Sequence, residues 1–148
     1  MNRDEFYART MHTPDDPVRA ARRATLREIS RQLMPLHRAL IDAAKGDFAI
    51  AYEQVDKPSH LLQLLNEHPF FAWLKPMTSL IVDIDEMSRT DFEPKDFEGV
   101  VKRVQSLIGS GATAEFSEHY IPILQRDVDV AIAHAALRQA LMRVANGQ

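Results

Sequence analysis

Three residues near the end of the chain carry groups that could bind a ligand. Asp127, His134 and Arg138 are separated by seven and four positions. On one continuous helix with about 100° per residue, they fall within a sector of roughly 60° together with Ala131. Apolar residues flank this sector on both sides, so the pattern predicts an anion, an imidazole and a guanidinium on a core-facing surface. Because an unpaired buried charge is costly, we expect these groups to have partners or to line a wet cavity.

Two other helical segments offer partners for this sector. Asp85 projects to the edge of an apolar arc, and we expect it to be the buried carboxylate of its segment. His37 projects to the rim of a leucine-rich stripe nearer the N-terminus. If the three faces pack together, they enclose one candidate ligand-binding site: His37, Asp85, Asp127, His134 and Arg138.

The residue types leave three interpretations of this site open. In the first, Asp85 or Asp127 accepts hydrogen bonds from His134 and Arg138, and the network only fixes the register of the helices. In the second, Arg138 holds a small anion, because a guanidinium suits a carboxylate or a phosphate. The third is a metal ion, which the spacing disfavours, because Asp127 and His134 are about 10 Å apart along a helix and no Glu-x-x-His motif occurs. We therefore predict no metal and no other cofactor.

Catalytic motifs are missing from the chain. It contains no cysteine, which excludes thiol catalysis, iron–sulfur clusters and cysteine-ligated zinc. Neither a Gly-x-Ser-x-Gly elbow nor a glycine-rich phosphate loop occurs. The sequence therefore favours a protein without catalytic activity.

The first helical segment has a basic edge that also contains apolar residues. Four of its arginines lie along one flank of the leucine stripe, and Met34 and Ile41 form a weaker apolar strip among them. Such a strip is typical of a two-fold homodimer face or of a face for a protein partner. The alternative is a solvated face with ion pairs to neighbouring helices. The predicted interface comprises Arg23, Arg27, Arg31, Met34, Arg38 and Ile41.

Glycines and prolines divide the chain into helical segments. The spacing of apolar residues predicts four long helices, and Pro35, Pro76 and Pro122 inside three of them predict kinks. A connection over 46–57 and a short extra helix over 61–67 complete the fold. We expect an antiparallel four-helix bundle of the all-α class, with long helices over 16–46, 69–87, 94–108 and from 113 almost to the C-terminus.

Composition and charge restrict the class of protein. The 148 residues are 45% hydrophobic, enough for one domain, and we expect residues 16–148 to form it behind an N-terminal arm over 1–15. A net charge of −3 disfavours a nucleic-acid binder. Neither a secretory signal nor an apolar run of membrane length is visible, so we expect a cytoplasmic protein with no membrane partner. We therefore expect a non-enzymatic interaction or regulatory module that acts as a homodimer. Binding of a small anion or a metal ion in the bundle core is the alternative.

Overall fold

Every regular element of the structure is a helix. The structure is a computed structural model that describes residues 14–109 and 111–147, and it contains no strand in these residues. The all-α class is therefore confirmed. Of the expected arm over 1–15, residues 1–13 lie outside the described residues. None of the described helices is both long enough and apolar enough to cross a membrane. The elements are α2 (Pro17–Ala51), α3 (Pro58–Glu67), the 3-10 helix η1 (Pro69–Leu74), α4 (Lys75–Met87), α5 (Pro94–Ile108), α6 (Ala114–Arg126) and α7 (Val128–Ala145).

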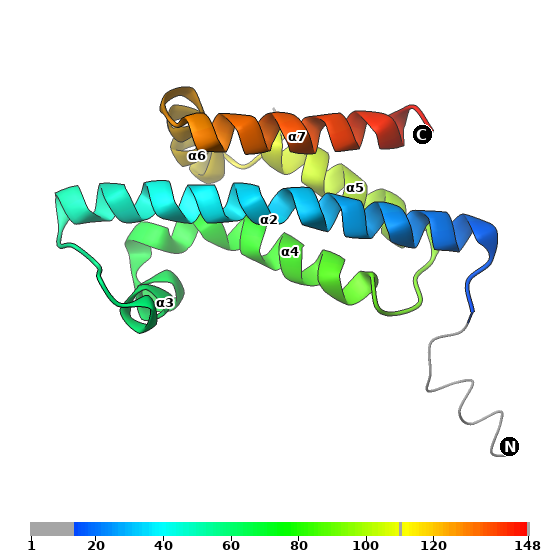
Figure 1. Ribbon diagram of the computed structural model, residues 1–148, viewed down its shortest axis with the longest axis horizontal. Helices are drawn as coiled ribbons and strands as arrows, with labels where there is room; N and C mark the ends of the chain where they lie inside the picture. Colours follow the sequence, from blue (N-terminus) through cyan, green and yellow to red (C-terminus); the bar gives the residue numbers. More distant parts are fainter. Residues whose placement is uncertain (1–13, 110, 148) are drawn as a thin grey trace, which may run out of the picture.

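The long helix α2 lies at the centre of the fold. It begins after Asp16, whose side chain accepts a hydrogen bond of 2.7 Å from the Arg19 N–H, and Pro17 occupies its first turn. Figure 1 shows α7 along one side of α2 and α4 along the other, and both run antiparallel to α2. Steps of three and four residues place one apolar stripe against these neighbours. The stripe is fully buried and contains Leu26, Ile29, Leu33, Leu36 and Leu40.

Helix α2 extends beyond Gly46, where the sequence predicts its end. The predicted connection is wrong in its first residues, because the helix continues to Ala51. A glycine inside a helix costs about 1 kcal/mol relative to alanine. Burial of Phe48 offsets this cost, since its ring packs against Phe70 and Phe71 at centroid distances of 5.4 and 5.3 Å.

The helix predicted over 69–87 consists of two elements. The first is η1, which His68 caps by accepting a hydrogen bond of 3.1 Å from the Phe70 N–H. The second is α4, which begins at Lys75, so Pro76 lies in its first turn, where a proline displaces no hydrogen bond. The predicted kink at Pro76 is therefore replaced by a junction between two helices.

Helix α5 has the bounds that its sequence predicts. A capping box opens it, in which the Asp96 side chain accepts a hydrogen bond of 2.9 Å from the Glu93 N–H. An ion pair between Arg103 and Asp83, at 2.8 Å, links its exposed side to α4. The apolar face of α5 is buried and comprises Phe97, Val100, Val101, Val104 and Leu107.

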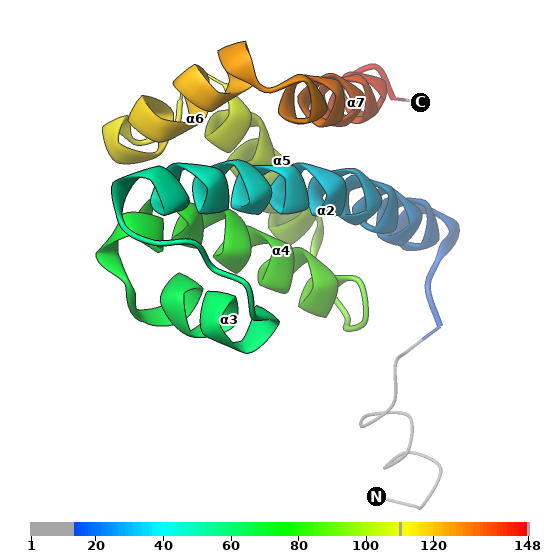
Figure 2. The ribbon, with the colours of Figure 1, turned by 60° about the vertical axis from the view of Figure 1, so that its left-hand side comes forward.

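The last predicted helix is interrupted at Asp127. The backbone is extended there, with φ −111° and ψ 115°, so α6 and α7 are separate helices. Figure 2 shows the change of direction between them. The Asp127 side chain accepts a hydrogen bond of 3.0 Å from the Val130 N–H and therefore caps α7. A projection that treats this region as one continuous helix is consequently wrong.

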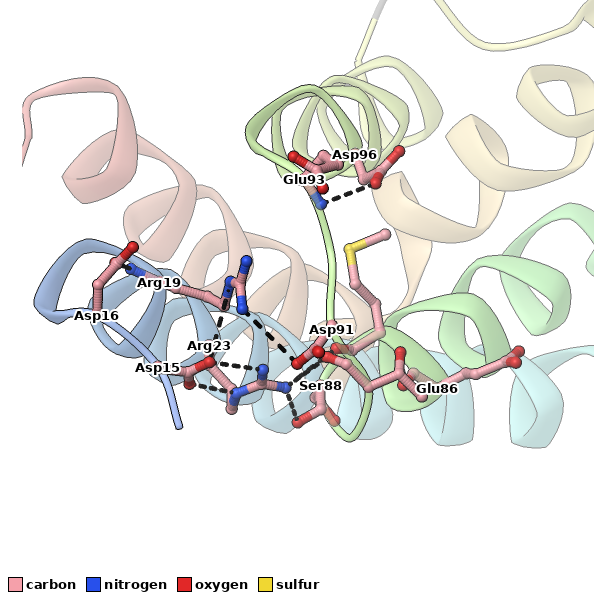
Figure 3. Close-up of polar contacts among 11 residues, drawn as sticks. Asp15, Asp16, Arg19, Arg23, Glu86, Ser88, Asp91, Glu93 and Asp96 are labelled. Carbon is pink, nitrogen blue, oxygen red and sulfur yellow. Dashed lines mark hydrogen bonds and ion pairs between the residues drawn. The ribbon is translucent and has the colours of Figure 1, made fainter. Parts of the chain in front are cut away.

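A buried arginine ties the start of α2 to the end of α4 (Figure 3). Arg23 holds the Asp15 carboxylate with two hydrogen bonds, from Nε to Oδ2 at 2.7 Å and from Nη2 to Oδ1 at 3.0 Å. Its Nη1 donates to the carbonyl oxygens of Ser88 and Thr90, at 2.9 and 2.8 Å. The hydrogen bond with Asp15 raises the pKa of Arg23. Three chain segments therefore meet at one guanidinium, which we call the Arg23 clamp.

Removal of this guanidinium should destabilise the fold. In Arg23→Leu, the Asp15 carboxylate and two carbonyl groups lose a buried partner, so we expect the free energy of unfolding to fall by about 2 to 4 kcal/mol. Arg27→Leu is the matched control, because Arg27 is exposed one turn further along α2, and we expect a change below about 0.5 kcal/mol. Urea unfolding followed by circular dichroism measures both variants. An equal fall in the free energy of unfolding in both variants would show that the Arg23 clamp stabilises the fold no more than an exposed arginine does.

Candidate functional site

The structure does not bring the five predicted ligand-binding residues together. Asp85 is exposed and pairs at 2.7 Å with an arginine on the next turn, so the expectation that it is buried is wrong. His37 lies between α2 and α4, and Asp127 caps α7. His134 and Arg138 remain neighbours on α7. Among the described residues, no group of three or more His, Asp or Glu side chains is placed to hold a metal ion.

Helix α7 turns a different face to the core from the predicted one. Ala131 and Arg138, which the projection places in the middle of the buried sector, are exposed. The error arises because the projection combined the apolar positions of α6 and α7, which Asp127 separates into two helices with independent phases. The buried positions of α7 are Val130, Ala133, Leu137, Ala140 and Leu141.

His134 joins α7 to α6 through a tyrosine. Its Nδ1 lies 2.6 Å from the hydroxyl oxygen of Tyr120, whose buried ring packs against Phe116 at a centroid distance of 5.1 Å. Burial lowers the pKa of His134, and the positive charge of Arg138 lowers it further. Burial also raises the pKa of Tyr120. Both groups are therefore neutral near pH 7, and the pair acts as a hydrogen bond between helices.

Only part of the interface predicted on α2 is exposed in the structure. Arg23 is buried in the Arg23 clamp, so its assignment to an exposed face is wrong. Ile41 is half-buried and lines a cleft between α2, α3 and α4. The residues of the set that are exposed are Arg27, Arg31, Met34 and Arg38. Three arginines around one methionine make this remainder a poor match for a second copy of itself, because like charges would face each other.

A larger exposed apolar surface lies on α7. Val128, Ile132 and Met142 are 71%, 63% and 57% exposed. Ala131 and Ala135 are exposed between them. We call these five residues the outer face of α7. Two exposed polar residues, Arg138 and Gln139, lie on the same side of the helix as these five. Helix α7 therefore carries apolar residues on both its inner and its outer side, although the outer face is interrupted by polar groups.

A shallow groove continues the outer face of α7 towards α2. Ile132 and Ala136 line it from α7, and Pro35, Ala39 and Arg38 line it from α2. Gln32, Asp42 and Asp129 also line the groove, so it continues the outer face beyond a single helix as a mixed polar and apolar surface. The occurrence of apolar residues on both sides of α7 is the signal in the sequence that points to this second surface.

Comparison with known proteins gives no relative on which to base a function. No protein-family model, no curated protein and no solved structure matches this chain.

Protonation of His134 should lower the stability of the fold. Its pKa in the folded protein lies below the value of about 6.5 in an unfolded chain, so the unfolded state binds the proton more tightly. Stability from this group is present above pH 6.5 and is lost as the pH falls below it. Burial lowers the pKa of His37 as well, which adds to the same trend. We expect a lower urea midpoint at pH 5.5 than at pH 7.5.

His134→Gln isolates the contribution of this histidine. A glutamine amide can keep a hydrogen bond to Tyr120 but takes up no proton in this range. The difference between the midpoints at the two pH values should therefore shrink in the variant. A difference of unchanged size would assign the pH dependence to other groups.

Proposed function

We propose that this protein is a non-enzymatic interaction module that acts as a homodimer, with the outer face of α7 as its interface. The exposure of Val128, Ile132 and Met142 on a helix whose other side is already buried carries this proposal. Helices α2, α5 and α6 cover the inner side of α7. A second copy would cover the outer side and remove the largest apolar side chains of this helix from water.

Antiparallel pairing about a two-fold axis at Ala135 fits the spacing of this face. Val128, Ala135 and Met142 are seven residues apart. Val128 of one copy would therefore meet Met142 of the second copy, while the two Ala135 residues face each other. A small residue at the axis allows the two helix axes to approach to about 8 Å. The same patch serves both copies, which closes the assembly at two.

Charges along one edge of the face fit the same pairing. Asp129 lines the groove next to α2, and Arg143 lies 3.8 Å from Glu28 of α2. The two residues stand six positions before and eight positions after Ala135. Antiparallel pairing therefore brings each Asp129 close to Arg143 of the second copy.

The face is smaller than a standard protein–protein interface. An 18-residue helix is about 27 Å long and about 10 Å wide. Covering one side of it buries less than the roughly 800 Å² per partner of a standard interface, even with the groove included. We therefore expect a dimer that dissociates at micromolar concentrations.

Ala135→Arg tests this interface. A bulky cation at the two-fold axis would face its own copy, so we expect the variant to stay monomeric. Sedimentation velocity from about 5 μM to about 500 μM should show the wild type shifting towards twice its mass of 16.8 kDa, and the variant remaining at the monomer mass.

Two further proteins serve as controls for this experiment. Ala24→Arg makes the same change at an exposed alanine of α2, and it should dimerise like the wild type. A double variant, Arg27→Glu with Arg31→Glu, tests the exposed remainder of the strip predicted on α2. If that variant alone becomes monomeric, the interface lies on α2. A wild type that is monomeric at every concentration would contradict the homodimer itself.

A further inference from the structure

A cleft of about 410 Å³ lies between α2, α3 and α4, on the side of α2 away from α7. Figure 2 shows α3 beside α4. Leu62, Leu65 and Asn66 of α3 line the cleft. The volume is within the roughly 300–1,000 Å³ of small-molecule sites. We call it the His37 cleft, and it shares no lining residue with the outer face of α7.

The walls of the His37 cleft differ in polarity. Ile41 of α2, Leu62 and Leu65 of α3, and Phe71 of η1 make its apolar walls. Leu62 is 60% exposed although it lines the cleft, so part of this apolar wall still faces water. An apolar ligand body would remove that surface from water, at about 25 cal/mol for each Å² covered.

The wall formed by α4 is polar and positive. Thr78 and Ser79 follow Lys75 by three and four residues, which places all three on one side of the helix. The Thr78 hydroxyl donates to the Leu74 carbonyl at 3.3 Å and lies 3.1 Å from Nε2 of His37. None of the described residues that line the cleft is acidic, so the Lys75 ammonium has no opposite charge within the lining.

We propose that the His37 cleft binds a small monocarboxylic acid with an apolar body, such as a medium-chain aliphatic acid. Lys75 supplies one positive charge for one carboxylate, and the Ser79 hydroxyl supplies a hydrogen-bond donor on the same wall, whereas the Thr78 hydroxyl proton is already donated to the Leu74 carbonyl. The apolar body lies against Leu62, Leu65 and the other apolar walls. A cationic ligand of the same shape would meet the lysine and no carboxylate.

Helix α3 is suited to be an adjustable wall for such a ligand. None of its residues is fully buried, and its leucines are half-buried or exposed. It packs mainly against η1. A helix with so little buried surface can shift at small cost, so ligands of slightly different length can be accommodated.

Isothermal titration calorimetry with octanoate tests the proposal. Octylamine and 1-octanol, which have the same chain with a cationic or a neutral head, are the comparison ligands. We expect octanoate to bind at least tenfold more tightly than octylamine and more tightly than octanol. Absence of octanoate binding, or equal affinity for octanoate and octylamine, would overturn the proposal.

Two variants on α4 locate the site. Thr78→Trp places an indole in the cleft and should weaken octanoate binding at least tenfold. Val82→Trp is the matched control, because Val82 is exposed one turn further along α4 and does not line the cleft. The Val82→Trp variant should bind octanoate as tightly as the wild type does. Equal affinity of both tryptophan variants would place any binding elsewhere.

Lys75→Gln tests the carboxylate contact without filling the cleft. An exposed ion pair contributes up to about 1 kcal/mol, so octanoate affinity should fall about two- to fivefold, while octanol affinity should not change. Ala135→Arg should bind octanoate like the wild type, which separates this site from the homodimer interface. A loss of octanol affinity equal to that of octanoate in Lys75→Gln would contradict the role of the ammonium group.

Discussion

The burial of the apolar stripe of α2 is the constraint on which the rest of the structure depends. Leu26, Ile29, Leu33, Leu36 and Leu40 are completely covered, and helices far apart in the sequence are needed to cover them. Because α7 and α4 take opposite sides of α2, each can cover part of the stripe while keeping another surface exposed (Figure 1). The outer face of α7 and the His37 cleft both arise in this way.

Charged groups are accommodated in this fold by pairing or by loss of charge. Arg23 meets a carboxylate and the carbonyl groups beyond the end of α4, which is the end of a helix where a cation is favoured. His134 stays neutral and shares a hydrogen bond with Tyr120. In the described residues, no buried polar side-chain atom is left without a hydrogen-bond partner. The polar groups near the core therefore connect helices to one another.

The two proposed sites use opposite sides of the same scaffold. The outer face of α7 is largely apolar and has charged residues of both signs along one edge, which is the basis of the proposed homodimer. The His37 cleft is concave and has a positive wall, which suits a small anion with an apolar body. Their positions follow from the same cause, since α7 and α4 pack on different sides of α2 and neither is covered completely by the monomer.

The amino-acid sequence alone determined the helical class, the buried stripe of α2 and the bounds of α5, because these depend on the spacing of apolar residues and on local capping. Tertiary structure decided the rest. One extended residue, Asp127, resets the phase of α7, so positions predicted in the core became exposed. Contacts with η1 carry α2 past Gly46, because burial of Phe48 outweighs a local signal to stop. His37 lies in a cleft because α3 folds back beside α4, and no periodicity within one helix can show where another helix will lie.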